Sequence, residues 1–181
     1  NIEEGTFVFE GLTRAEDVRA AVELGFDALG FILAPESPRQ VTLEAVERLL
    51  PLIPPFVAVV AVVAAMERGE LKRIVDSRCF DAVQFHGGES PAVVASVPLR
   101  RIVAFPVAGR EDLERVRDYD GVADAFLFDA KRGGQSGGTG EVFDWNVLRG
   151  VDFARPIILA GGLGPENVRR AIERAGPAAV D

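Results

Sequence analysis

Short strand-like segments alternate along this chain with stretches of helical periodicity, and no other feature of the sequence constrains the fold as strongly. The segments expected to be strands are 6–10, 27–33, 56–64, 81–86, 99–105, 123–129, 156–160 and 177–181. The stretches expected to be helical are 14–24, 42–52, 67–76, a short segment from Ser90, 110–118, 144–148 and 165–175. Apolar strands separated by helices form parallel sheets that those helices cover. Eight such units predict an α/β protein with a closed (β/α)8 TIM barrel rather than an open sheet.

Size and charge limit the remaining possibilities. The chain has 181 residues and a formal net charge of −8, and no linker-like segment divides it, so residues 1–181 are expected to form a single barrel domain. The negative charge argues against a nucleic-acid partner, because no basic patch is present to neutralise phosphates. The longest apolar run, 56–66, has 11 residues, whereas about 20 are needed to cross a bilayer. Residues 1–5 show no signal-peptide pattern, and the sequence therefore predicts a cytoplasmic protein with no membrane partner.

Metal and nucleotide cofactors find little support in the sequence. Cys79 and His86 are the only cysteine and the only histidine, which argues against a disulfide, a cysteine metal cluster or a conventional zinc site. No Gly-x-Gly-x-x-Gly turn follows the first strand, so no dinucleotide is expected. The Gly-rich loop 132–140 lacks the Gly-Lys-Ser/Thr ending of a P-loop and is interpreted as a mobile lid.

Candidate site residues are sought at the carboxyl ends of the strands, where (β/α)8 barrels build their active sites. The residues found there are Glu10, Arg39, Gln84, His86, Asp129, Gly161 and Gly162. The residues end at Asp181, within the expected eighth strand, so the final helix of a (β/α)8 barrel is expected to be missing from this sequence.

These strand ends carry motifs that resemble one family. The motifs, in chain order, are Gly11-Leu12-Thr13, Gly30-Phe31-Ile32, Ser37-Pro38-Arg39, Val83-Gln84-Phe85-His86-Gly87, the loop 133–140, Phe143-Asp144-Trp145 and Leu159-Ala160-Gly161-Gly162-Leu163. The chain resembles phosphoribosylanthranilate isomerase from about residue 6 to residue 181. This family of (β/α)8 barrels serves tryptophan biosynthesis and isomerises a phosphoribosyl-aminobenzoate by an Amadori rearrangement without a cofactor.

The resemblance implies roles for several of these residues. Asp129 matches the general acid of the family, and Arg39 matches the residue expected to face the carboxylate of the substrate. Gly161 and Gly162 match half of a backbone phosphate site. The other half would follow Asp181, so the phosphate site is expected to be vestigial.

The chain also departs from the family pattern. Glu10 stands where the family has its catalytic cysteine, and Val8 stands where it has a lysine. On the third strand a Gly-x-Phe-x-Asn pattern is replaced by residues that include Val63, and on the fifth strand Val103 replaces the usual lysine. Taken as pocket positions, Val8, Val63 and Val103 describe an apolar cavity around one new carboxylate.

We interpret this combination as a repurposed and engineered pocket. A carboxylate in an apolar cavity has a raised pKa, which suits a general base acting on a carbon-bound proton. The expected reaction is proton abstraction by Glu10 from a small planar aromatic substrate, of the Kemp-elimination type. The expected contacts to that substrate are Arg39, Gln84, His86, Val8, Val63 and Val103.

Two alternatives stay open at this point. One is phosphoribosylanthranilate isomerase activity, native or residual, with Glu10 in place of the cysteine. The other is a binding barrel without catalysis. Each of them predicts a small-molecule ligand, no cofactor, no metal, and a monomer or a homodimer.

Overall fold

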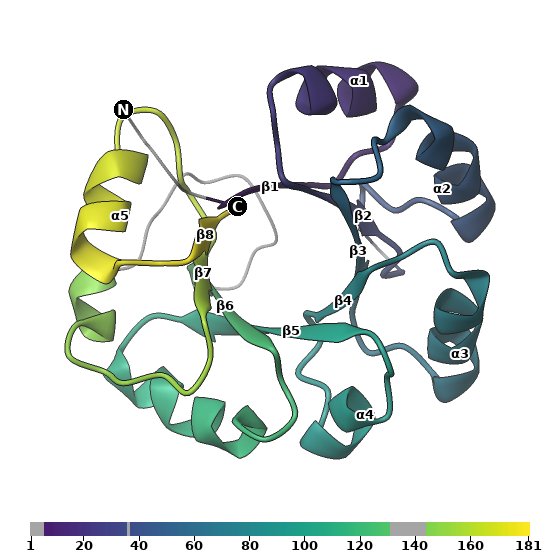
Figure 1. Cartoon of the computed structure of the whole chain (residues 1–181). Coiled ribbons are helices and arrows are strands. Elements are labelled where there is room, and N and C mark those ends of the chain that lie inside the picture. The colour runs from purple at the N-terminus through teal and green to yellow at the C-terminus, as the bar shows by residue number, and fades with distance from the viewer. Residues whose placement is uncertain (1–5, 36, 131–143) are drawn as a thin grey trace.

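The strands of the protein form one closed ring. The computed structural model describes residues 6–35, 37–130 and 144–181. Within these residues eight parallel strands follow one another in sequence order, and the ring closes where β8 pairs with β1 (Figure 1). The strands are β1 Thr6–Glu10, β2 Ala28–Ile32, β3 Ala58–Val63, β4 Ala82–Phe85, β5 Arg100–Val107, β6 Ala125–Ala130, β7 Ile157–Leu159 and β8 Ala179–Val180. The (β/α)8 barrel predicted from the alternation of segments is confirmed.

Helices surround the ring on its outer side (Figure 1). The α-helices are α1 Ala15–Glu23, α2 Leu43–Leu49, α3 Arg68–Ser77, α4 Pro91–Ala95 and α5 Val168–Ala175, and the 3₁₀ helices are η1 Leu50–Leu52, η2 Arg110–Tyr119 and η3 Trp145–Leu148. Thr42 caps α2 by accepting a hydrogen bond from the Ala45 N–H at 3.2 Å. No helix in the described ranges is long and apolar enough to cross a membrane.

Several helices lie where the sequence predicts them, but in two cases the predicted type of helix is wrong. Segments 110–118 and 144–148 were expected to be α-helical, but they form the 3₁₀ helices η2 and η3. The helix expected over 42–52 changes from α2 into η1 near Pro51, because proline lacks the N–H that an α-helix needs there. The predicted lid, 132–140, lies outside the described residues.

The interior of the ring is filled by small and medium apolar side chains. Paired residues of parallel strands point the same way, so the pairs Glu10–Gly30, Val62–Gln84 and Pro106–Asp129 mark the inner face. The inner side chains form three small clusters, whose buried members are Ala28, Val60 and Ala82; Ile32, Ala34 and Val62; and Ala104, Leu127, Ile158, Ala160 and Ala179. This packing fills the barrel below its mouth, which is the end where the carboxyl termini of the strands lie.

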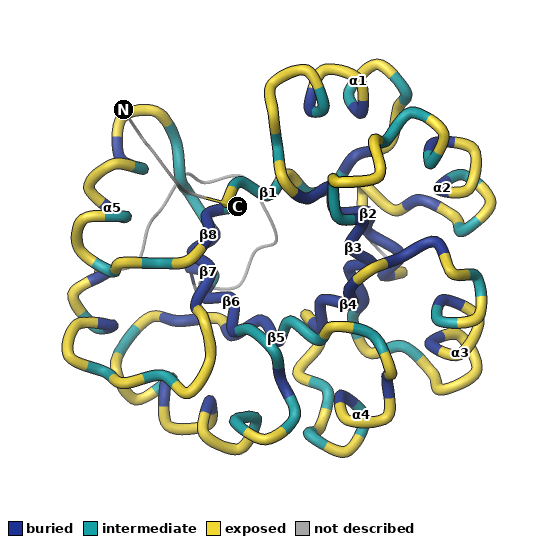
Figure 2. Tube along the Cα trace, viewed as in Figure 1, coloured by how far each residue is buried: buried dark blue, intermediate teal, exposed yellow. Residues whose placement is uncertain are grey.

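The larger core lies between the ring and the helices. Phe85, Phe126 and Phe128 are fully buried there, and the buried strands contrast with the exposed outer faces of the helices (Figure 2). Val63 and Val103 belong to this outer layer, because Val63 pairs with Phe85 and Phe85 pairs with Val103. The expectation that these two valines line the pocket is therefore wrong.

Three aspartates repeat one contact at the amino-terminal end of the barrel. Each directly precedes an even-numbered strand, and its carboxylate accepts a hydrogen bond from a backbone N–H of the preceding odd strand. The bonds join Phe7 to Asp27 (2.8 Å), Val59 to Asp81 (2.8 Å) and Arg101 to Asp124 (2.9 Å). In return, the N–H of each aspartate donates to the carbonyl of the same partner. The carboxylates thus fasten strands together in pairs at the end opposite the mouth.

We predict that Asp81→Ala destabilises the barrel. The change removes the acceptor of the buried Val59 N–H, and such a loss costs about 1–3 kcal/mol. Urea denaturation measures the change in the free energy of unfolding. Asp152→Ala is the matched control, because Asp152 is an exposed aspartate in the segment before β7. Equal changes in the two variants would contradict a stabilising role for the Asp81 contact.

Candidate active site

Three carboxyl groups meet at the carboxyl-terminal mouth of the barrel. Glu10 ends β1, Asp129 lies near the end of β6, and Asp181 follows β8. Asp129 pairs with Pro106 on the inner face of the ring, and Asp181 has the same strand parity as the interior residue Ala179. As whole residues all three are half-buried, but Glu10 and Asp129 each have a carboxyl oxygen that is fully buried. The sequence predicted Glu10 and Asp129, but it did not identify Asp181.

The electrostatic environment of Glu10 favours its protonated form. Burial raises the pKa of Glu10 well above the ordinary value, and the negative charge of Asp181 raises it further. The side chains of Gln84 and Arg39 act in the opposite direction without overcoming these effects. A large part of Glu10 therefore retains its proton at pH values where an exposed glutamate is ionised.

Asp181 experiences a similar environment. Burial raises the pKa of Asp181 to about 7, and the charge of Asp129 contributes in the same direction. Glu10 and Arg39 lower it. Two neighbouring carboxyl groups thus titrate well above the range of free carboxylates.

Glycines provide the space that these charged side chains occupy. A Cβ atom on Gly30 would lie 2.6 Å from Cγ of Glu10, and one on Gly161 would lie 2.1 Å from Oδ1 of Asp129. Gly161 also has a φ of +81°, a conformation that residues with side chains rarely adopt. Gly30 and Gly161 thus leave room at the mouth for the side chains of Glu10 and Asp129.

Polar atoms at the mouth are buried without a protein partner. Among the described residues, the buried side-chain atoms that lack a hydrogen bond include Oε1 of Glu10, Nε2 of Gln84 and Oδ1 of Asp129. All three residues lie on the inner face of the ring at its mouth. Buried polar groups are normally paired, so a cluster of unpaired ones indicates a place for a polar ligand or water.

The remaining predicted site residues to be placed are Arg39, His86 and Val8. The guanidinium of Arg39 lies over Gly11, where a Cβ atom would come within 2.7 Å of its nitrogen, and the Arg39 side chain is exposed at the rim. His86 follows β4, and its N–H donates to the Val63 carbonyl at 2.8 Å. Desolvation lowers the pKa of His86, although Asp129 and Glu89 act against this effect. Val8 packs with the interior clusters below Glu10.

Glu89 organises one side of the mouth and was not singled out from the sequence. Its carboxylate accepts hydrogen bonds from the N–H groups of Ala65, at 2.7 Å, and Gly87, at 3.0 Å. The hydroxyl of Tyr119 donates to the Glu89 carbonyl at 2.7 Å. The loops after β3 and β4 are thereby held together next to His86. A glutamate in a loop offers no sequence signal for such a bridge.

The loop after β7 carries Gly161 and Gly162, the predicted phosphate-binding residues. The buried Asn167 donates to the Gly162 carbonyl at 2.8 Å and accepts from the Gly164 N–H at 2.9 Å. Both glycines have positive φ values, so only glycine fits this turn without strain. The loop leads directly into α5, whose amino-terminal end would favour an anion.

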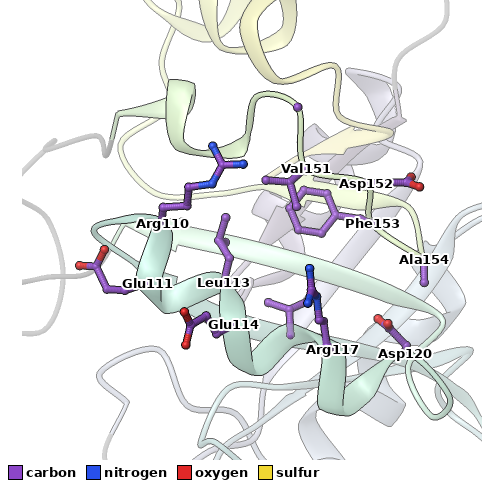
Figure 3. Close-up of a pocket in the computed structure, with 12 residues that line it drawn as sticks. Arg110, Glu111, Leu113, Glu114, Arg117, Asp120, Val151, Asp152, Phe153 and Ala154 are labelled. Atoms are coloured by element: carbon purple, nitrogen blue, oxygen red, sulfur yellow. The ribbon is translucent and has the colours of Figure 1, made fainter.

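A hollow of about 840 Å³ lies elsewhere, on the outer side of the barrel. It is bounded by η2 and by the segment 150–154, and charged side chains such as Arg110, Glu114 and Arg117 surround apolar ones such as Leu113 and Phe153 (Figure 3). None of the unpaired buried atoms of the mouth borders it. We therefore place the candidate active site at the mouth. In the described part of the chain, no group of three or more His, Cys, Asp or Glu is arranged to hold a metal ion.

Comparison with known proteins identifies the family to which the chain belongs. The family model for N-(5'-phosphoribosyl)anthranilate isomerase matches residues 8–181. The chain belongs to the phosphoribosylanthranilate isomerase family. It is 44% identical over 171 residues to the isomerase of Petrotoga mobilis. The aligned region covers 94% of this chain and 82% of that relative.

Solved structures of the phosphoribosylanthranilate isomerase family have the same fold. The isomerase of Thermotoga maritima matches with a TM-score of 0.90 and 35% identity, over 98% of this chain and 86% of that one. Another isomerase structure contains reduced 1-(o-carboxyphenylamino)-1-deoxyribulose 5-phosphate and matches with a TM-score of 0.86 and 32% identity, over 98% and 86% of the two chains.

These findings overturn the interpretation of an engineered Kemp eliminase. The family model and the two named relatives, which match over almost the whole chain, are phosphoribosylanthranilate isomerases, and they give no support to Kemp elimination or a designed pocket. The structure removes part of the physical basis as well, because Val63 and Val103 face the helices. The isomerase alternative is the one that the family supports.

We predict that Gly30→Ala displaces the Glu10 side chain. The new Cβ atom would overlap Cγ of Glu10, and overpacking of this kind costs about 1–3 kcal/mol. A crystal structure of the variant and its free energy of unfolding test the displacement and the cost. Gly69→Ala is the control, because a Cβ atom there meets nothing within 4 Å. An unmoved Glu10 together with an unchanged stability would show that Gly30 does not make room for the carboxyl.

Proposed function

We propose that this protein isomerises N-(5'-phosphoribosyl)anthranilate, with Glu10 as the general base and Asp129 as the general acid. The observation that carries the proposal is the pair of carboxyl oxygens, one on each residue, that are buried at the mouth of the barrel without a protein partner. The family model that matches residues 8–181 supports the same reaction.

An Amadori rearrangement needs one proton donor and one proton acceptor. Asp129 donates a proton to the ring oxygen of the ribose while the bond from that oxygen to C1 breaks and a C1=N double bond forms. Glu10 then removes the proton from C2, which gives an enolamine. Loss of the C2 hydroxyl proton and protonation of C1 yield the aminoketose, so the atoms of substrate and product balance. General acid and base groups of this kind each contribute about 10²–10⁴-fold to a rate.

Charged groups of the substrate find complementary groups around these carboxyls. Arg39, at the rim and electrostatically coupled to Glu10, would face the carboxylate of the aminobenzoate ring. The N–H groups of Gly161 and Gly162, in the loop that leads to α5, would hold the phosphate. The unpaired amide of Gln84 would donate to a hydroxyl of the sugar. The substrate would then span the mouth from β2 to β7.

Glu10 replaces the cysteine base that is usual in the family, and Val8 replaces the nearby lysine. A carboxylate can take the same proton, provided that it is ionised. The raised pKa of Glu10 makes its carboxylate a stronger base than an exposed glutamate, at the expense of the ionised fraction. Activity is therefore expected to increase with pH as Glu10 loses its proton.

The cell biology of the protein follows from the same proposal. An enzyme of tryptophan biosynthesis works in the cytoplasm on a small-molecule substrate. One Thermotoga maritima isomerase is described as dimeric, and for this chain a monomer and a homodimer are both compatible with the proposed reaction. Size-exclusion chromatography with light scattering distinguishes the two.

We predict that the purified protein converts phosphoribosylanthranilate and that Glu10→Gln and Asp129→Asn each lower kcat by about 10²–10⁴-fold. The decrease in anthranilate-type fluorescence during turnover measures the rate. Glu114→Gln, an exposed change on η2, is the control and should leave kcat unaltered. Glu10→Cys restores the residue usual in the family and should retain activity.

Two outcomes would contradict the proposal. One is an active wild-type protein whose rate is unaffected by both carboxyl substitutions. The other is a folded protein that binds the reduced product analogue without any turnover, which would make it a binding barrel. Growth of a tryptophan auxotroph that lacks the isomerase provides an independent readout of the same activity.

A further inference from the structure

Asp181 lies next to Glu10 because the barrel closes between β8 and β1. Thr6 pairs with Ala179 and Phe7 with Val180, so the next step of the register places Asp181 beside Val8. Glu10 lies two residues further along the same face of β1. The N–H of Asp181 donates to the Leu159 carbonyl at 2.9 Å, which continues the β7–β8 ladder and fixes the backbone of Asp181.

The surroundings of this pair contain little positive charge. Apart from Asp129, the inner positions of the other strands at the mouth carry neutral residues, which include Gly30, Val62, Gln84, Pro106 and Ala160. Besides the two carboxyls themselves, the charged groups of the described residues that act on the pair are Arg39 and Asp129. Arg39 is exposed, and it is the one described guanidinium that acts on both carboxyls.

We propose that Glu10 and Asp181 act as one carboxyl pair that holds a single proton between them, so that Asp181 sets the pH at which Glu10 becomes a base. Two carboxylates in adjacent buried positions cannot both ionise readily, and their protons leave in two separated steps that belong to the pair. The proton-sharing itself does not depend on the reaction. The catalytic consequence rests on the proposed isomerase function, in which Asp181 is a positioning residue.

Burial and the closeness of the two carboxyls together determine the pKa values of both groups. Burial is the main cause of the raised pKa of Glu10 and of the pKa of Asp181 at about 7, and each of the two carboxyls influences the other. With one proton, the pair carries one negative charge in total rather than two. Arg39 is placed to balance that one charge.

We predict that Asp181→Asn lowers the pKa of Glu10 by about one unit, because the like charge is removed. Carbon-13 NMR of the ligand-free protein, labelled at the side-chain carboxyls of glutamate and aspartate, measures this titration directly. Asp152→Asn is the control, since Asp152 is exposed in the segment before β7, at the opposite end of the barrel. Arg39→Gln should shift the Glu10 midpoint upward, because the neutralising charge is lost.

The kinetic readout separates this inference from the proposed function. In Asp181→Asn the acidic limb of the pH profile of kcat/KM should move to lower pH by the same amount as the NMR midpoint. A coupled NMR titration in a protein without isomerase activity would reject the function and keep the carboxyl pair. A Glu10 midpoint that is the same in wild type and in a folded Asp181→Asn variant would overturn the pair, whatever the activity.

The stability of the protein gives a further check that needs no substrate. Carboxyls whose pKa is higher in the folded state stabilise the fold while they are protonated, and this stabilisation is lost as pH rises from the unfolded value toward the folded one. The free energy of unfolding should therefore fall between about pH 4 and pH 7. This fall should be smaller in Asp181→Asn than in Asp152→Asn, and equal falls would count against the pair.

Discussion

Closure of the parallel sheet between β8 and β1 is the constraint on which the rest of this structure depends. Once the ring is closed, every second residue of each strand must point into a narrow space. Most of that space is filled by alanine, valine, leucine and isoleucine, and only the carboxyl end stays open to polar groups. Residues far apart in the sequence, such as Glu10, Asp129 and Asp181, therefore share one mouth.

The two ends of the barrel use carboxylates for opposite purposes. At the amino-terminal end, Asp27, Asp81 and Asp124 each accept a backbone N–H of a neighbouring strand, so their charges are satisfied and stabilise the pairing. At the mouth, Glu10 and Asp129 each keep a buried oxygen without a protein partner. The stabilising contacts thus lie at one end of the barrel, and the groups available to a ligand lie at the other end. Other barrels of this type show the same division.

Much of the site could be predicted from the sequence because its motifs follow strand ends in a fixed order. Glu10, Gln84 and Asp129 lie on the inner face at the mouth, as parity and family resemblance suggested. Val63 and Val103 were misplaced, since β3 and the middle of β5 are apolar on both faces and carry no alternation that reveals which face is inside. The engineered-pocket interpretation rested in part on those two positions, and the match to the isomerase family overturned it.

By itself, the sequence determined the class of fold, the order of the strands and the identity of the residues at their ends, because alternation and local motifs are properties of neighbouring residues. Only the tertiary structure decided which face of each strand is inside, since that depends on the register between strands. It also decided that Asp181 lies beside Glu10, and that Gly30 and Gly161 leave room for the carboxyls. The contact between Asp181 and Glu10 joins opposite ends of the chain, and it exists only because the ring closes.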